Sequence, residues 1–285
     1  MTHYIENDFF KVGVKEQGCE LTSIFCKNTG FEYLWQGDKS VWYGQSPILF
    51  PIVGRLLEDK YILDGKEYNM PKHGFARNLP WSVKSENADT VELILTQNEY
   101  TLSIYPYDFD FTVTFALKQN SLCVTHRIKN KNNRTMYFSL GAHPAFNCEI
   151  GDRLSFSKKE SLNCMKIDLE KSLLLPDTYP LLNNETDIVI TEDIFKEDAL
   201  IFKGIKSDFV TLKSDNNTRQ IKFDLGKAPY LGIWAKPGAP YVCIEPWYGV
   251  NDSKERKADL SLKEGINAIE PGEEFEFTWS AEFNG

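Results

Sequence analysis

The sequence predicts an all-β protein folded as a large antiparallel β-sandwich. Three observations support this fold class: apolar and polar side chains alternate along several segments, turn-forming residues separate those segments, and no long amphipathic helix is apparent. Aromatic residues make up 13% of the 285 residues, a composition that suits half-buried pleated surfaces. Many short strands joined by turns are typical of sandwiches and related all-β folds.

Four segments show the clearest strand pattern. They cover residues 91–96, 111–117, 122–129 and 275–283, and apolar side chains occupy every second position in each. Successive side chains of a strand point to opposite faces of the sheet. Each segment is therefore predicted to place one face in a core and the other in a wetter environment.

Turn signals predict two hairpins between strands and one further turn. Polar residues at 118–120 and at 214–217 each separate two apolar segments, and Asp64-Gly65 predicts a further turn at 63–66. Asn, Asp and Gly favour such turns because they tolerate positive φ angles. The strands on either side of 118–120 and of 214–217 are expected to pair antiparallel.

Residues 1–285 are predicted to form a single domain. No linker rich in Pro, Gly or Ser divides the chain, and neither internal repeats nor low-complexity tracts occur. With 42% hydrophobic residues, a chain of this length buries a sizeable core without disulfides or a metal.

The charge balance argues against several classes of partner. The net charge is -9 and the basic residues are dispersed, so binding to nucleic acid or to an anionic membrane is not expected. No apolar run approaches membrane-spanning length, and the N-terminus does not resemble a signal peptide. The six cysteines contain no C-x-x-C pair and are interpreted as reduced thiols. These features predict a cytoplasmic protein, and they leave its oligomeric state open.

The chain has only four histidines, and two of them are candidates for function. His73 and His143 lie where strand-like segments are interrupted by Gly or Pro, and binding sites tend to form at such strand ends. His126 is in register with apolar residues of the segment 122–129 and is expected to be a core residue. His3 is expected to have no role in function.

Three further residues stand out because their surroundings are apolar. Glu245 closes a buried-looking strand, where burial would raise its pKa toward the range of a general base, although a Glu that turns into solvent is an equal alternative. Trp247 could stack on a sugar or pack in the core. Arg55 needs a partner, either a ligand hydroxyl or a carboxylate such as Glu58.

Several segments, taken in order, resemble a known family. They are Val53-Gly54-Arg55, His73-Gly74-Phe75, His143-Pro144-Ala145-Phe146-Asn147, Ile244-Glu245-Pro246-Trp247 and Ile269-Glu270-Pro271-Gly272-Glu273. Together they span nearly the whole chain and resemble the aldose 1-epimerase (galactose mutarotase-like) superfamily, in particular its LacX-like branch. The resemblance implies the galactose mutarotase-like supersandwich, in which an open face of the sandwich holds a sugar.

The resemblance also implies catalytic roles for two residues. Glu245 matches the general base of the family and His143 matches its general acid. One departure is clear: the galactose-processing branch carries a Tyr two places after the acid His, where this chain has Ala145. Contacts to the sugar are therefore expected to differ, and the resemblance does not imply a preference for galactose.

The same resemblance implies substrate-binding residues. His73 and Arg55 match the second His and the Arg of the family, and Trp247 is carried as a further candidate. Asp198 is the best match to the sugar-binding Asp of the family, with Asp193 and Asp208 as nearby alternatives.

The implied activity is the interconversion of the α and β anomers of a hexose by acid–base ring opening and closure. This isomerase reaction requires two proton transfers and neither cofactor nor metal, and the sequence lacks a glycine-rich phosphate loop, a Rossmann signature and a clear metal cluster. The expected partner is a small sugar.

Two alternatives remain at the level of sequence. A hexose-6-phosphate 1-epimerase could use Arg77 and Lys72 to bind the phosphate, and a non-catalytic carbohydrate-binding protein could keep the same fold. A glycoside hydrolase is disfavoured because it usually needs two opposed carboxylates, and only Glu245 is well supported.

Overall fold

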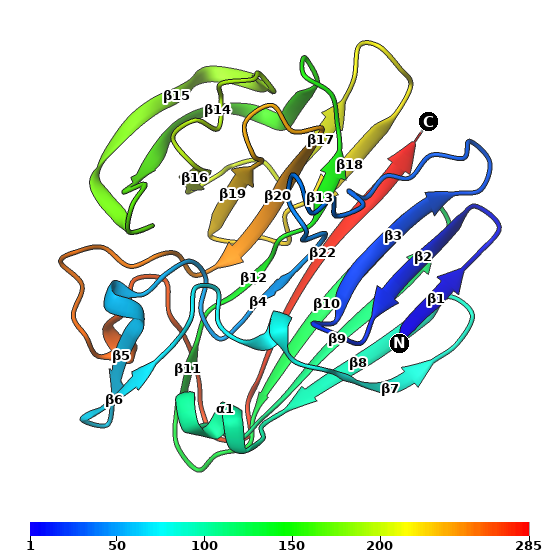
Figure 1. The fold of residues 1–285 in the computed structure, drawn as a ribbon. Coiled ribbons are helices and arrows are strands. Elements are labelled where there is room, and N and C mark those ends of the chain that lie inside the picture. Colours follow the sequence, from blue (N-terminus) through cyan, green and yellow to red (C-terminus); the bar gives the residue numbers. More distant parts are fainter. Residues whose placement is uncertain (285) are drawn as a thin grey trace.

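Alternating apolar and polar side chains build one extended antiparallel sheet that dominates the computed structural model, which describes residues 1–284 (Figure 1). Fifteen strands belong to this sheet. Their spatial order is β4 (Ile48–Leu49), β12 (Leu140–Ala142), β20 (Tyr241–Tyr248), β19 (Tyr230–Trp234), β16 (Leu200–Lys203), β14 (Arg153–Ile167), β17 (Phe209–Lys213), β18 (Gln220–Asp224), β22 (Glu274–Asn284), β10 (Ser121–Asn130), β9 (Phe109–Lys118), β8 (Thr90–Thr96) and β7 (Ser82–Glu86), with β13 (Ala145–Asn147) beside β20 and β15 (Leu174–Val189) beside β14.

A second layer is formed by a three-stranded sheet of β1 (Thr2–Glu6), β2 (Phe10–Lys15) and β3 (Glu20–Cys26). This sheet lies beside the large one (Figure 1), strand β1 contacts β8 and β9, and buried side chains of both sheets belong to one hydrophobic core. Two ribbons complete the β-structure, β5 (Lys60–Leu63) with β6 (Lys66–Asn69) and β11 (Met136–Phe138) with β21 (Asn267–Ile269). The helical segments are α1 (Glu99–Ile104) and 3-10 turns at Leu57–Asp59, Ala76–Asn78 and Leu260–Leu262.

The predicted all-β sandwich is confirmed, including the faces of the four clearest strands. Strands β8, β9, β10 and β22 occupy the predicted segments, and the apolar positions of their alternating patterns are buried apart from the half-buried Phe275. The two predicted hairpins are present as β9–β10 and β17–β18, and the predicted turn at 63–66 joins a further hairpin, β5–β6. In the last of these, Asp64 and Gly65 both have positive φ angles, of 51° and 76°, as a tight two-residue hairpin turn requires.

Two very long strands, β14 and β15, were not predicted from the sequence. Their pairing contains several register shifts, and many of their side chains are polar or exposed on both faces. Bulges of this kind interrupt the period-two pattern from which strands are recognised. The hairpin therefore becomes apparent only from its pairing in space.

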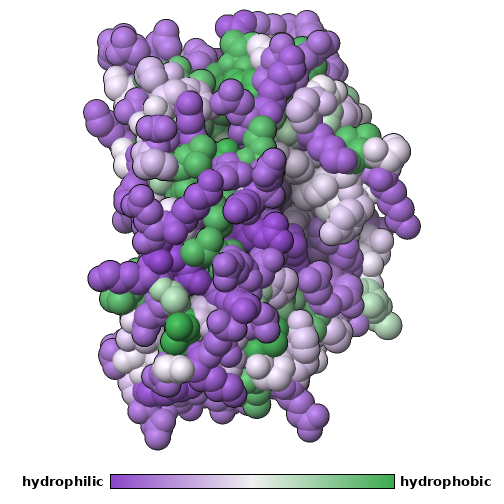
Figure 2. All heavy atoms as spheres, turned by 60° about the vertical axis from the view of Figure 1, so that its left-hand side comes forward, coloured by the Kyte–Doolittle hydropathy of each residue, from purple (hydrophilic) through white to green (hydrophobic). Residues whose placement is uncertain are grey.

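The surface agrees with the acidic, polar composition. In Figure 2 hydrophilic side chains cover most of the visible face, and hydrophobic ones occur in small groups. No helix within residues 1–284 has the length and apolar character needed to cross a membrane. All six cysteines are free, and all except the partly exposed Cys123 are buried.

Candidate active site

One cavity of about 300 Å³ gathers most of the residues that the sequence singled out. Its lining contains six predicted site residues together with Lys72 and further side chains. The lining residues are Trp42, Lys72, His73, Arg77, His143, Ile167, Asp198, Ala199, Trp234, Glu245, Trp247 and Asn251.

Glu245 and His143 meet because of the pairing of three strands. Glu245 lies on β20, and both β12 and β13 pair with that strand, through Gly141 opposite Trp247 and Ala145 opposite Cys243. His143 lies in the break between β12 and β13. The register therefore places His143 opposite the part of β20 that carries Glu245.

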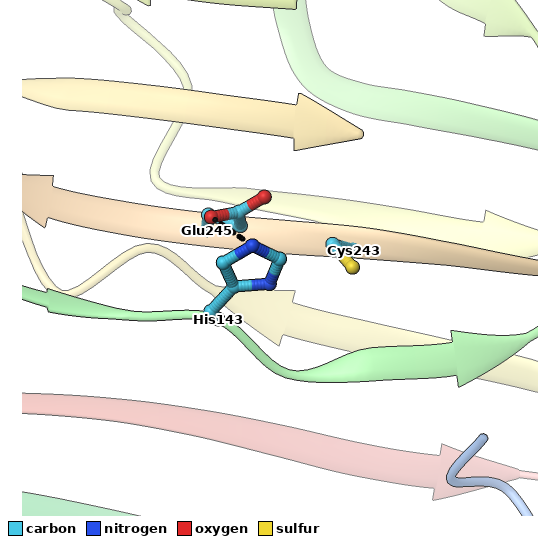
Figure 3. A group of neighbouring side chains, drawn as sticks. All are labelled: His143, Cys243 and Glu245. Atoms are coloured by element: carbon cyan, nitrogen blue, oxygen red, sulfur yellow. Dashed lines mark ion pairs between the residues drawn. The ribbon is translucent and has the colours of Figure 1, made fainter. Parts of the chain in front are cut away.

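The two side chains are in direct contact, as Figure 3 shows. His143 Nε2 lies 3.2 Å from Glu245 Oε2. The Glu245 carboxylate is 1% exposed and the His143 side chain 10%, so the pair is nearly dry but His143 reaches the cavity. A close pair of this kind is a functional candidate because its members exchange protons readily.

Burial perturbs the titration of both groups. It raises the pKa of Glu245 well above its usual range, opposed by the hydrogen bond from Trp247 and reinforced by the charge of Asp198. It lowers the pKa of His143 to about 3, with positive charge on Arg77 and Lys72 adding to the effect. Burial thus disfavours the charged form of each group.

Cys243 is the third potential metal ligand beside this pair (Figure 3). It lies two residues before Glu245 on β20 and therefore on the same face of the strand. Burial raises the pKa of its thiol well above the usual range. Burial therefore disfavours the thiolate, which is the form in which cysteine binds metals.

His73 reaches the cavity from a strained turn after β6. Its φ angle is 65°, and Gly74, at 72°, approaches β4 so closely that a Cβ there would lie 2.1 Å from the Phe50 carbonyl oxygen. The backbone N–H of Gly54 donates to His73 Nδ1 at 3.1 Å. This bond requires the proton of the neutral ring to reside on Nε2. Burial, followed by the charges of Arg77 and Lys72, lowers the pKa of His73 well below its usual range.

Two cations, Lys72 and Arg77, flank His73 on the same loop. Arg77 donates through Nη2 to the Lys72 carbonyl at 3.0 Å, and its buried Nε has no partner. Lys72 Nζ lies 3.4 Å from Ser172 Oγ. Within the described part of the chain, no carboxylate forms an ion pair with either cation, so both remain available to a ligand.

The structure separates the three aspartates that the sequence left as alternatives. Asp198 lines the cavity, whereas Asp193 pairs with Lys196 and Asp208 pairs with Lys158 on the exposed surface. Asp198 has a φ angle of 72° and accepts a hydrogen bond from the Ala199 N–H. The turn before β16 thus directs this carboxylate to the site.

Arg55 is not among the residues that line this cavity, contrary to the expectation drawn from the sequence. Its guanidinium binds the Asp59 carboxylate through two hydrogen bonds of 2.7 and 2.8 Å, and it lines a separate depression with Glu58 and Lys171. The physical reason is local, because Asp59, four residues on, binds the guanidinium of Arg55. The structural partner is Asp59 rather than Glu58.

Two aromatic residues of the site were missed by sequence reasoning. Trp42 stacks on the His143 ring with centroids 5.2 Å apart, and Trp234 meets the same ring edge-on at 5.8 Å. Trp42 lies in an irregular loop and Trp234 ends β19, so neither belongs to a motif. Asn251 also lines the cavity, and sequence reasoning missed it because it belongs to no motif.

Comparisons with known proteins show consistent similarities. A family model described as Aldose 1-epimerase matches residues 1–263. The plasmid-encoded protein LacX of Lactococcus lactis subsp. lactis is 33% identical over 286 residues, covering 95% of each chain. The structure of a galactose mutarotase related enzyme from Lactobacillus acidophilus superimposes with a TM-score of 0.95 at 32% identity, covering 100% of this chain and 98% of the other.

A more distant relative comes from Escherichia coli strain K12. It is 26% identical over 200 residues, covering 67% of this chain and 65% of its own, and it is provisionally assigned as a glucose-6-phosphate 1-epimerase.

Proposed function

Because the chain belongs to the aldose 1-epimerase family, we propose that it interconverts the α and β anomers of an aldohexose, with Glu245 as general base and His143 as general acid. The observation that carries this proposal is the 3.2 Å separation of His143 Nε2 and Glu245 Oε2 beside a polar cavity. The two oxygens that exchange protons in this reaction, O1 and the ring oxygen, are bonded to the same carbon. An acid and a base that serve both must therefore be close neighbours.

Ring opening requires two proton transfers. The Glu245 carboxylate takes the proton from the O1 hydroxyl while protonated His143 donates a proton to the ring oxygen, so that the bond between C1 and the ring oxygen breaks and C1 becomes an aldehyde. Rotation about the C1–C2 bond presents the other face of the aldehyde. Closure reverses both transfers and restores the original state of Glu245 and His143.

The buried pair suits this exchange because it holds one labile proton. Burial favours neutral His143 and protonated Glu245, and moving the proton from Glu245 to His143 gives the catalytic ionic form without a net change in charge. Ring opening converts the ionic form back to the neutral one. The low polarity that disfavours the ionic pair thereby assists the opening step.

The remaining lining residues are proposed to bind the sugar. Neutral His73 offers Nε2–H as a donor, and the Asp198 carboxylate offers acceptors for hydroxyl groups. Trp42 and Trp234 hold the His143 ring and present apolar surface toward the cavity. Arg55 is left out of the proposed site because Asp59 occupies its guanidinium.

Replacement of the base tests the proposal. Glu245→Gln keeps the shape but removes the proton acceptor, so kcat should fall by about 10²–10⁴-fold while sugar binding persists. Polarimetry with an aldose such as glucose measures the rate. The matched control is Glu160→Gln, since Glu160 is equally buried at 1% but binds the backbone of Lys206 and Ser207.

The outcome separates the proposal from its alternatives. Equilibration of anomers at the wild-type rate by Glu245→Gln would contradict the assignment of the base. A wild-type protein that binds sugars without accelerating mutarotation would indicate the non-catalytic carbohydrate-binding alternative.

A second candidate function is the epimerisation of a hexose 6-phosphate. The observation in its favour is that Lys72 and Arg77 line the cavity without a carboxylate partner among residues 1–284. Arg binds phosphate oxygens well because its planar group presents parallel donors. The carboxyl groups of Asp198 and Glu245 line the same cavity, and their presence argues against a phosphate there.

The two substrates are distinguished by kcat/KM for glucose and for glucose 6-phosphate. If the phosphate is the substrate, Arg77→Ala should lower kcat/KM for glucose 6-phosphate by about tenfold or more, corresponding to a lost charge-assisted hydrogen bond, and should leave the glucose reaction nearly unchanged. Arg127→Ala is a suitable control because Arg127 pairs with Glu276 on the surface. Equal effects of Arg77→Ala on both substrates would argue against a phosphate site.

A further inference from the structure

The indole of Trp247 lies beside the carboxylate of Glu245. The two residues are two positions apart on β20, so they share one face of the strand. Trp247 Nε1 donates a hydrogen bond to Glu245 Oε2 at 3.2 Å, and Trp247 is only 3% exposed. The residue is thus nearly fully buried, although it contributes to the lining of the cavity.

Two glycines on the neighbouring strands make room for this ring. A Cβ at Gly232 on β19 would lie 2.6 Å from Trp247 Cζ2, and a Cβ at Gly141 on β12 would lie 2.8 Å from Trp247 Cδ1. Neither glycine has a positive φ angle, so space rather than backbone conformation explains their presence. Gly232 pairs with Glu245 and Gly141 pairs with Trp247, which makes the slot a consequence of sheet register.

The slot fixes the direction of the indole N–H. Trp247 also belongs to a buried hydrophobic cluster with Leu49, Val53 and Tyr230, and packing of this kind restricts the rotation of a side chain. Apart from His143, Trp247 is the polar partner of the Glu245 carboxylate among the side chains that the structure describes.

We propose that Trp247 is a positioning residue for the reaction, whose indole N–H orients the Glu245 carboxylate toward the sugar and stabilises its ionised form. This inference rests on the proposed function, in which Glu245 is the base. It differs from the expectation that Trp247 contacts the substrate, because the ring is packed into the sheet and its donor is already used by Glu245.

Trp247 opposes the effect of burial on Glu245. Burial raises the pKa of the carboxyl group, whereas a hydrogen bond donated to the ionised form lowers it. Loss of the N–H should therefore move the titration of Glu245 to higher pH and reduce the fraction of base at neutral pH. A side chain that only filled space would not change this titration.

The variant Trp247→Phe keeps an aromatic ring in the slot and removes the donor. We expect kcat to fall about ten- to a hundredfold, as for loss of a hydrogen bond to a charged group. KM should stay nearly constant, and the limb of the pH–rate profile governed by Glu245 should move to higher pH. Trp279→Phe is the matched control, because Trp279 is 1% exposed and its Nε1 has no hydrogen-bond partner.

A second measurement uses the wild-type protein, so the test does not depend on folding of the variant. The chain has six tryptophans, and their indole N–H groups are resolvable by ¹H–¹⁵N NMR. One indole resonance should shift with pH together with the Glu245 limb, and that shift should vanish in Glu245→Gln.

The results distinguish failure of this inference from failure of the proposed function. If Glu245→Gln is inactive but Trp247→Phe keeps the wild-type kcat and pH profile, Trp247 is not a positioning residue although the base is correctly assigned. The absence of any titrating indole in wild type would overturn the inference in the same way. An active Glu245→Gln enzyme would overturn the proposed function itself.

Discussion

The functional behaviour of Glu245 and His143 depends on an environment that neither residue creates alone. Buried without partners, either charged form would be costly, because transfer from water into a low-polarity interior disfavours charge. In contact at 3.2 Å, the two groups keep one proton between them and avoid an isolated charge. The pair then titrates as a unit, with two apparent pKa values.

The pH dependence of activity follows from these shifts. The pair gains a second proton only near the lowered pKa of His143, about 3, and loses its last proton only near the raised pKa of Glu245. We therefore expect kcat/KM to stay on a plateau as pH falls through 6.5, the ordinary value for His, and to decline only in more acidic solution.

Polarimetry across the pH range checks this expectation, with Glu245→Gln at each pH as the background for uncatalysed and buffer-catalysed mutarotation. Circular dichroism at each pH separates loss of activity from unfolding. An acidic limb centred on 6.5 would show that His143 is not buried in the functional protein as it is in the structure.

At the scale of elements, the strands supply both the core and the site. On β10, His126 follows the apolar face predicted from the sequence: it is 1% exposed and stacks on Phe277 of β22 with ring centroids 5.3 Å apart. It is buried and does not line the cavity that contains Glu245 and His143. Its burial agrees with the core position predicted from the strand pattern.

His126 should make stability depend on pH. Burial lowers its pKa from 6.5 to about 3, so between these values the unfolded chain binds a proton that the folded protein excludes. Stability should therefore fall as pH decreases through this window, by up to about 1.4 kcal/mol per pH unit for this group. In His126→Leu the decrease of Tm with falling pH should be smaller than in wild type.

His3 provides a comparison of opposite sign. It bonds to Glu16 at 3.0 Å and to Glu86 at 2.9 Å, and the hydrogen bond to Glu16 is the main cause of its raised pKa. Its contribution is present below pH 6.5 and is lost as pH rises through the raised value. His3→Gln should therefore lower Tm in acid more than in alkali. A His126→Leu variant that lost Tm in the same pattern would contradict the assigned burial.

On the scale of the whole molecule, the last strand of the chain is central rather than peripheral. Strand β22 lies between β18 and β10 in the large sheet (Figure 1), and it pairs with β10 over Glu274–Glu282 and with β18 over Ser280–Asn284. Its buried side chains include Phe277, Trp279 and Phe283. The large sheet is therefore complete only when the C-terminal strand has paired with β18 and β10. We propose that the chain folds as a single domain.

Deletion of residues 274–284 tests this proposal. The truncated chain would expose two unpaired strand edges and lose several buried side chains, each worth about 1.5–3 kcal/mol. We expect it not to fold, as judged by circular dichroism and limited proteolysis. Deletion of residues 1–6, which removes the edge strand β1, is the control and should leave a folded protein with a lower Tm. A stable, cooperatively folded product of the C-terminal deletion would argue against one folding unit.

The sequence by itself determined the fold class, the four clearest strands with their buried faces, two hairpins, a further turn and the family. These features depend on period-two alternation and on turn residues, which are local in the chain. The ordered motifs also directed attention to Glu245, His143 and His73, because each interrupts or ends an apolar segment.

Only the tertiary structure decided which of the candidate residues share a cavity. It brought Asp198 to the cavity in preference to Asp193 and Asp208, and it placed Arg55 with Asp59 instead. Trp42 and Trp234 reach His143 from distant segments, and the slot for Trp247 exists because glycines on two other strands lie beside it. The physical reason is register: contacts across a sheet depend on how remote strands align, and local periodicity carries no record of that alignment.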